Sequence, residues 1–388
     1  MQLNMVSEHG VITERKNIII EEGTSNVKNI IVNAFALRKS GALTIYRQFV
    51  AHLSSFVDNK RYFIFVDSSV EQPVINGVTY IVDGDHSWKH RLLWEHGGLL
   101  KWLKKNNITP DVVVSLQNTG CCIDCRQVIY YHQSIPFYPH KWNFFKDTER
   151  MMWLYKYIYP LFVKSTLSSK TDVVVQIPFI KKQFVRKFGI DANRVHVLFP
   201  DTNIINIETI KRKSLNSNYF HFLYPATPNP YKEHKTLVEA LCLLRENNRV
   251  VFDRVRIHFT LSKGDYPHLD NLISQHQLQN QFVMDGMMPI NELFSFYKAS
   301  CGLLFPSTLE TLGLPLLEAA SLGVPIIAAN LDYAHEVLEG YKGVQFADSQ
   351  NYILWASLIE KLCLSHCMYP SLPAKESTWG QFFKLIEG

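Results

Sequence analysis

Short apolar runs alternate with stretches of helical periodicity along most of the chain, and these runs fall into two series. The first series of expected strands covers 27–35, 62–66, 79–82, 112–116, 128–132, 173–176 and 195–199, and the second covers 220–224, 255–261, 281–284, 302–305, 325–329 and 343–346. Strands that alternate with helices form parallel sheets covered on both faces. The pattern therefore predicts an α/β protein with two doubly wound, Rossmann-like domains.

A stretch of linker composition separates the two series. Residues 200–218 contain a proline, several Asn and Ser residues, and the basic run Lys211 to Lys213. We therefore expect one domain over 1–205 and a second over 206–370, followed by a terminal segment, 371–388, that ends in an amphipathic helix. Ligands of open α/β sheets bind beyond the carboxyl ends of the strands, so the cleft between two facing domains is the expected active site.

Length and composition are those of a globular protein large enough for two cores. The chain has 388 residues and a formal net charge of +5, which is too mild to argue for nucleic acid as a partner. It contains no run of about 18 or more apolar residues, and residues 1–23 lack the apolar core of a signal peptide. We therefore expect a cytoplasmic protein.

Seven cysteines fit a reducing compartment, because an odd number without a disulfide framework is typical there. Two groupings raise the alternative of a zinc site, namely Cys122 and Cys125 beside Cys121, and Cys363 and Cys367 with His366 between them. The second grouping lies in a different predicted domain from the first. Scattered buried thiols are the simpler interpretation, so we predict no metal site.

The segment 305–323 places two carboxylates around the start of a predicted helix. Pro315 occupies a position tolerated in a first helical turn, and Gly323 ends the helix. Glu310 then lies in the preceding loop, and Glu318 lies about one turn inside. Unpaired N–H groups at a helix start favour an anion such as a diphosphate, while ionised carboxylates accept hydrogen bonds from hydroxyls. This combination suits a phosphorylated sugar.

The spacing Glu-x7-Glu, with Gly-Leu-Pro between the two and Gly-Val-Pro-Ile-Ile-Ala-Ala-Asn after them, resembles the retaining nucleotide-sugar glycosyltransferases of family 4, of the type that builds bacterial surface polysaccharides. The resemblance extends over roughly 220–345. It implies the GT-B fold, in which an acceptor-binding domain, 1–205, and a nucleotide-sugar-binding domain, 206–370, face a central cleft. The C-terminal helix of 371–388 would then cross back to the first domain. The resemblance also implies a UDP- or GDP-linked sugar as donor, with no cofactor and no obligatory metal.

The resemblance assigns expected roles to the residues of this segment. Glu310 would contact the transferred sugar and Glu318 the ribose, while backbone amides of Thr311, Leu312 and Gly313 would hold the diphosphate. Thr311 and Leu312 stand where the family usually has Gly-Phe. This departure leaves the sugar specificity open. The alternative is an ordinary βαβ unit with two solvated glutamates.

A second segment, 225–237, lies between a predicted strand and a predicted helix and resembles the phosphate-binding segment of the family. Lys232 aligns with a lysine that donates to the diphosphate. A basic residue near a helix start is disfavoured by the helix dipole, which suggests a bound anion as its partner. Thr227 replaces the usual arginine. Lys235 is the alternative lysine, and either one could simply be exposed to solvent.

Three positions of the first domain are expected to face the cleft. His132 follows a predicted strand, and the resemblance implies a place near the reacting sugar or acceptor; a histidine that only caps the strand end is the alternative. Asn118 is a weaker candidate at a similar strand end. Gly41 belongs to the small-residue turn 39–42, where the family has a glycine-rich loop that approaches a phosphate or an acceptor. A plain strand-to-helix turn is the alternative there.

The stretch 141–170 combines aromatic and basic side chains. Met152, Tyr155, Tyr159 and Phe162 recur at helical spacing, and rings with snorkelling lysines are typical of a helix that lies on anionic lipid. Packing of this stripe against the core of the first domain is the alternative. Pro160 is expected to kink the helix.

The sequence therefore predicts a retaining hexosyltransferase that moves a sugar to a hydroxyl of a glycan acceptor, lipid-linked if membrane contact is real. Two other classes stay open: a glycoside hydrolase with Glu310 and Glu318 as its acid and nucleophile, and a transferase-like scaffold that has lost activity. The expected catalytic residues are Glu310, His132 and Lys232, and the expected donor-binding residues are Gly41, Thr227, Lys232, Glu310, Thr311, Leu312, Gly313 and Glu318.

Overall fold

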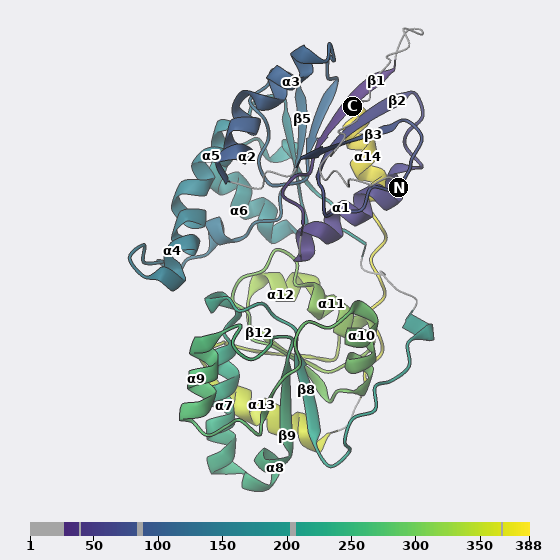
Figure 1. Ribbon diagram of the computed structural model, residues 1–388. Helices are drawn as coiled ribbons and strands as arrows, with labels where there is room; N and C mark the ends of the chain where they lie inside the picture. The colour runs from purple at the N-terminus through teal and green to yellow at the C-terminus, as the bar shows by residue number, and fades with distance from the viewer. Residues whose placement is uncertain (1–26, 39, 84–87, 202–206, 366–367) are drawn as a thin grey trace, which may run out of the picture.

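The computed structural model describes residues 27–38, 40–83, 88–201, 207–365 and 368–388. Two α/β domains lie one above the other, each with a parallel sheet at its centre (Figure 1). The predicted fold class, two doubly wound Rossmann-like domains, is confirmed.

The first sheet has seven parallel strands in the order β3-β2-β1-β4-β5-β6-β7. Every residue of β4 and β6 is buried, because helices cover both faces of these inner strands. The strands are β1 Lys28–Asn33, β2 Lys60–Asp67, β3 Val78–Asp83, β4 Val112–Ser115, β5 Arg126–Tyr130, β6 Thr171–Val175 and β7 Val195–Val197.

The helices of the first domain are α1 Ser40–Leu53, α2 Trp88–Leu93, α3 Leu99–Lys105, α4 Asp147–Trp153, α5 Tyr159–Ser165 and α6 Pro178–Phe188. Helix α1 begins at Ser40, so the expected turn is part of the helix, and Gly41 lies in its first turn. Lys39 of that turn lies outside the described residues. A π-helical turn, Leu154–Ile158, interrupts the helix just before Pro160, where the sequence predicts a kink.

The second sheet has six parallel strands in the order β10-β9-β8-β11-β12-β13. Strands β8 and β11 are neighbours, so the loops that follow them leave the sheet side by side. The strands are β8 Phe220–Tyr224, β9 Val255–Phe259, β10 Phe282–Met284, β11 Gly302–Phe305, β12 Ile326–Ala329 and β13 Val344–Ala347. The helices are α7 His234–Asn247, α8 Arg249–Arg254, α9 Pro267–Gln275, α10 Ile290–Ala299, α11 Leu314–Ser321, α12 Asp332–Val337 and α13 Tyr352–Leu364.

The last helix, α14 Trp379–Glu387, packs against the first domain although it follows the second domain in the chain (Figure 1). The Phe383 ring stacks on Phe56 with 4.4 Å between the ring centroids. Arg126 donates to the carbonyl of Leu385 at 2.5 Å. The amphipathic pattern of this segment therefore buries its apolar face on the core that α1 also covers.

The aromatic and basic stretch divides between core and surface. Tyr159 is 4% exposed, and Met152, Tyr155 and Phe162 are half-buried, so the predicted stripe faces the protein. Phe145, in contrast, is 88% exposed, and Met151 and Leu161 are also exposed. Within the described ranges, no helix combines the length and the apolar character needed to cross a membrane.

Candidate functional site

A pocket of about 390 Å³ lies between the two domains, at the carboxyl ends of both sheets. The first domain contributes the first turns of α1 and the residues after β5, and the second domain contributes the loops after β8 and β11. Eight of the nine residues predicted for the site line this pocket: Gly41, His132, Thr227, Lys232, Glu310, Thr311, Leu312 and Gly313.

Lys232 and Glu310 form an ion pair in the pocket, although 78 residues separate them in the chain. Their side chains are 13% and 14% exposed. Lys232 ends a short 3-10 turn, Pro230–Lys232, that precedes α7, so it lies outside the α-helix itself. Two mostly buried charges must pair with each other or with a ligand, because burying an unpaired charge costs free energy of folding. The pair therefore fixes both charged groups at the pocket wall.

The loop before α11 offers unpaired backbone donors to the pocket. Gly313 adopts a left-handed conformation with φ of 74°, where a Cβ atom would lie 3.2 Å from Leu316. Within the described part of the chain, the N–H groups of Thr311, Leu312 and Gly313 donate no hydrogen bond to protein. Leu312 is 2% exposed, so its side chain packs in the core. These N–H groups and the start of α11 can bind an anion.

Helix α1 brings a second helix N-terminus to the opposite wall. Gly41, Ala42 and Thr44, all in its first turns, line the pocket. A Cβ atom at Gly41 would meet nothing within 4 Å, so the protein itself gives this glycine no steric role. The partial positive charge of a helix N-terminus adds to the charge of Lys232. Both walls therefore favour a negatively charged group.

His132 is held in one orientation by Asn118. The backbone N–H of His132 donates to Asn118 Oδ1 at 2.6 Å, and Asn118 Nδ2 lies 3.4 Å from His132 Nε2. An amide nitrogen only donates, so Nε2 accepts and Nδ1 carries the proton. That Nδ1 has no partner among the described residues. Burial, together with the Arg91 guanidinium, lowers the pKa of His132 to about 4. His132 is therefore a neutral hydrogen-bond donor at neutral pH.

Glu318 is the one predicted site residue that does not line the pocket. It is 9% exposed, and its Oε2 accepts a hydrogen bond from Tyr297 at 3.1 Å. Burial raises the pKa of Glu318 to about 7, and the hydrogen bond from Tyr297 opposes that rise. The structure thus separates the two glutamates into a pocket residue and a residue buried beneath it. The ribose contact of Glu318 stays a prediction.

Several polar residues that the sequence did not single out also line the pocket. Gln176 follows β6, and Gln133 and Ser134 follow β5 after His132. Asn229 and Tyr231 lie in the loop of Lys232, and Asn229 Nδ2 donates to the exposed Thr227 at 2.9 Å. Their position directly after buried strands was a usable signal, because such ends meet at one edge of a parallel sheet. No arginine replaces Thr227 among the described lining residues.

Comparison with known proteins agrees with this geometry. Residues 206–370 match the family described as glycosyl transferases group 1. The O-antigen chain mannosyltransferase RfbU of Salmonella typhimurium is 22% identical over 237 residues, which cover 61% of this chain and 60% of that protein. The chain thus spans less than two thirds of the length of this relative.

Solved structures resemble the whole two-domain arrangement. A sucrose-phosphate synthase from Thermosynechococcus elongatus superposes with a TM-score of 0.66 at 13% identity, covering 93% of this chain and 94% of that one. The Anabaena protein HepE, solved with UDP and glucose, gives 0.58 at 15% identity, covering 87% and 90%. Residues 206–370 of this chain are thus similar to glycosyl transferases group 1, and the fold of the chain is GT-B.

Proposed function

We propose that this protein is a retaining glycosyltransferase that moves a sugar from a UDP- or GDP-sugar to a hydroxyl of a glycan acceptor in polysaccharide biosynthesis. The pocket supports this proposal most directly, because three groups that can donate hydrogen bonds to an anion or attract it meet there. They are the Lys232 ammonium, the unpaired N–H groups before α11, and the N-terminus of α1. A diphosphate between a sugar and a nucleoside has the charge and size that such a pocket can bind.

The names of similar proteins support the same substrate class. The relative from Salmonella typhimurium is named a mannosyltransferase of the O-antigen chain, and the Anabaena protein was solved with UDP and glucose. We extend a nucleotide-sugar donor and a polysaccharide product from these proteins to the present chain.

In the proposed reaction the departing diphosphate would be stabilised by Lys232 and the N–H groups of Thr311 to Gly313. The sugar leaves as an oxocarbenium-like ion while the acceptor hydroxyl attacks from the same face, and the departing phosphate takes the hydroxyl proton. Glu310 would orient the sugar by accepting hydrogen bonds from its hydroxyls. His132, neutral and with a free Nδ1–H, would donate one hydrogen bond to a sugar or acceptor oxygen.

The arrangement of carboxylates weighs against a glycoside hydrolase. That reaction uses two carboxyl groups on either side of one bond. Among the described residues that line the pocket, Glu310 is the only acidic one, and Lys232 neutralises it. Glu318 is directed to Tyr297 instead. The paired-glutamate mechanism therefore lacks its second group in this pocket.

Donor binding tests the proposal. An inactive scaffold could also bind the donor, so only a measurement of sugar transfer distinguishes it from an active enzyme. Isothermal titration calorimetry of the purified protein with a panel of UDP- and GDP-sugars should find one donor that binds. Uridine and guanosine, which lack phosphates, serve as matched ligands that should bind far more weakly. No affinity for any nucleotide sugar would contradict the proposal. Binding without transfer to any glycan acceptor would favour the scaffold.

We further propose that the acceptor is lipid-linked and that the first domain contacts anionic membrane. Phe145, Met151 and Leu161 are exposed beside the basic residues Lys146 and Lys164. Exposed apolar side chains among lysines are what an interfacial surface requires. Changing the three apolar residues to Ser should reduce sedimentation with anionic liposomes without altering the thermal transition. The matched control is Val250→Ser with Ile353→Ser, which removes exposed apolar residues from the second domain. Equal loss in both variants would contradict the proposal.

A further inference from the structure

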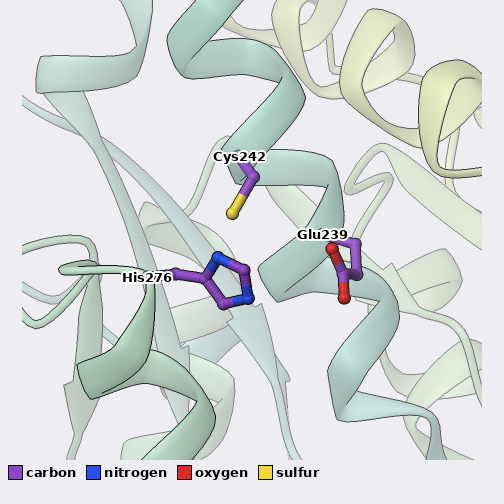
Figure 2. Close-up of side chains that lie close together, drawn as sticks. All are labelled: Glu239, Cys242 and His276. Atoms are coloured by element: carbon purple, nitrogen blue, oxygen red, sulfur yellow. The ribbon is translucent and has the colours of Figure 1, made fainter.

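Three side chains with metal-binding chemistry lie close together in the second domain, and none of them lines the proposed active site. Glu239 and Cys242 come from α7, and His276 directly follows α9. One ligand atom from each lies within 4.8 Å of the other two. Figure 2 shows the Cys242 sulfur and the Glu239 carboxylate on the side of α7 that faces the His276 ring. In the described part of the chain, no other trio of His, Cys, Asp and Glu gathers in this way.

This cluster is not the one that the cysteine spacing suggested. Cys121, Cys122 and Cys125 are free thiols that do not gather as a ligand group. His366 and Cys367 lie outside the described residues. Cysteine spacing could not indicate this cluster, because the residues near Cys242 are a glutamate on the same helix and a histidine that follows a different helix.

The backbone around the cluster is held in place without a metal. Glu239 and Cys242 are three residues apart on α7, so both side chains project from one face of the helix. His276 is anchored because Arg245, one turn further along α7, donates to its carbonyl at 2.8 Å. The buried Leu269 and Ile273 of α9 pack in the core that α7 shares. The three ligands thus come from two elements with a fixed separation.

The three side chains also lack partners of their own. Among the described residues, no hydrogen bond engages the Cys242 sulfur, the His276 ring or the Glu239 carboxylate. Within the described ranges, their one ionic contact is a long one, 3.8 Å from Lys235 Nζ to Glu239 Oε1. Polar groups that converge without bonding one another leave their lone pairs available.

We propose that Glu239, Cys242 and His276 bind a divalent zinc-like ion that links α7 to α9. A thiolate, an imidazole and a carboxylate form a ligand set typical of Zn²⁺, whereas Mg²⁺ and Ca²⁺ prefer oxygen ligands alone. Ligand atoms around tetrahedral Zn²⁺ lie ~3.3–3.8 Å apart. Small side-chain rotations from the observed separation, at most 4.8 Å, reach this geometry. Three protein ligands leave the fourth position for water.

The thiol makes binding depend on pH. Only the thiolate coordinates the metal, so binding releases a proton, and affinity falls as pH falls. A carboxylate-only site would lack this dependence near neutral pH.

Cobalt titration tests the site directly, with tag-free, reduced protein freed of metal by dialysis. Co²⁺ should produce a thiolate-to-cobalt charge-transfer band together with intense visible bands of tetrahedral cobalt, and Zn²⁺ should abolish both. Cys242→Ser should remove the charge-transfer band, and His276→Ala should weaken Zn²⁺ binding by about 10-fold or more. The matched control Cys122→Ser, at an exposed thiol, should behave like the wild type.

Thermal unfolding gives a second measure of metal binding that does not depend on the visible absorption of cobalt. Zn²⁺ should raise the Tm of the wild type and of Cys122→Ser, and should raise the Tm of Cys242→Ser and His276→Ala by less at the same Zn²⁺ concentration. Each variant must first show a cooperative transition in the absence of metal. A wild type without a charge-transfer band, or a Cys242→Ser variant that keeps it, would overturn the proposal.

Discussion

The two halves of the interdomain pocket differ in how they attract a ligand. The C-terminal half holds the charged groups, Lys232 and Glu310, and the unpaired N–H groups before α11. The N-terminal half offers a helix start and the neutral imidazole of His132. A nucleotide-sugar donor is anionic, whereas an acceptor hydroxyl is neutral. The C-terminal half therefore suits the diphosphate of the proposed donor, and His132 in the N-terminal half suits a hydroxyl of the proposed acceptor.

The largest effect should follow from removing the carboxylate of the C-terminal half. Glu310→Gln keeps the size of the side chain but loses the charge that pairs with Lys232. Transfer should fall by about 100- to 1,000-fold, as for loss of one aligned group in a transition state. Turnover with a nucleotide sugar measures this, and Glu336→Gln, at a contact between Glu336 and the Phe179 N–H, is the control. Near-normal turnover of Glu310→Gln would remove this residue from the site.

Lys232→Met should weaken donor binding by about 10- to 100-fold, because a hydrogen bond to a charged group contributes about 1.5–3 kcal/mol. Calorimetry with the donor checks this. Lys235→Met is the matched control, since the Lys235 side chain is 56% exposed and does not line the pocket. Equal losses in both variants would mean that general charge, not the pocket, binds the donor.

Two glycines, one from each half of the pocket, allow the halves to be compared by substitutions with smaller expected effects. Gly313→Ala places a side chain at φ of 74° and should cost ~1–2 kcal/mol of stability as well as donor affinity. Gly41→Ala meets no atom within 4 Å and should leave the Tm unchanged or slightly higher. A loss of substrate binding in Gly41→Ala at unchanged Tm would indicate close approach of a ligand to α1. Equal losses of Tm in the two variants would contradict the expectation that only the alanine at position 313 strains the backbone.

The smallest effect near neutral pH concerns one buried histidine in each domain. Burial lowers the pKa of His234 to about 3 and that of His132 to about 4, from an ordinary 6.5. Below pH 6.5 the unfolded chain therefore binds more protons than the folded protein, so stability falls as pH drops towards 4 and is insensitive to both groups above 6.5. Thermal unfolding across this range checks the sign. His234→Phe should show a shallower acid loss than the wild type.

Much of the C-terminal half was predictable because its signals are local. The strand 302–305, the loop with Glu310 and the helix after Pro315 occur in one short segment, and Lys232 follows a neighbouring strand. The expected turn over 39–42 was wrong for Gly41, because helix α1 already begins at Ser40 and includes this glycine. Glycine lowers helix propensity, but its cost is small in a first turn.

Burial was the property that local patterns could not decide. Glu318 has the helical position that the sequence predicts, yet it is buried, and the hydroxyl of Tyr297 from a different helix donates a hydrogen bond to its carboxylate. Tyr159 and Phe145 both belong to the aromatic stretch, but only Tyr159 packs against the core. The distinction depends on residues distant in the chain.

The sequence by itself determined the two parallel-sheet domains and the identity of the charged residues at the strand ends. Periodicity and loop chemistry are encoded by neighbours, so they can be read along the chain. Tertiary structure decided that Lys232 pairs with Glu310, that His132 is neutral, and that Glu239, Cys242 and His276 meet. These properties depend on distance and desolvation between remote segments, which only the folded chain brings together.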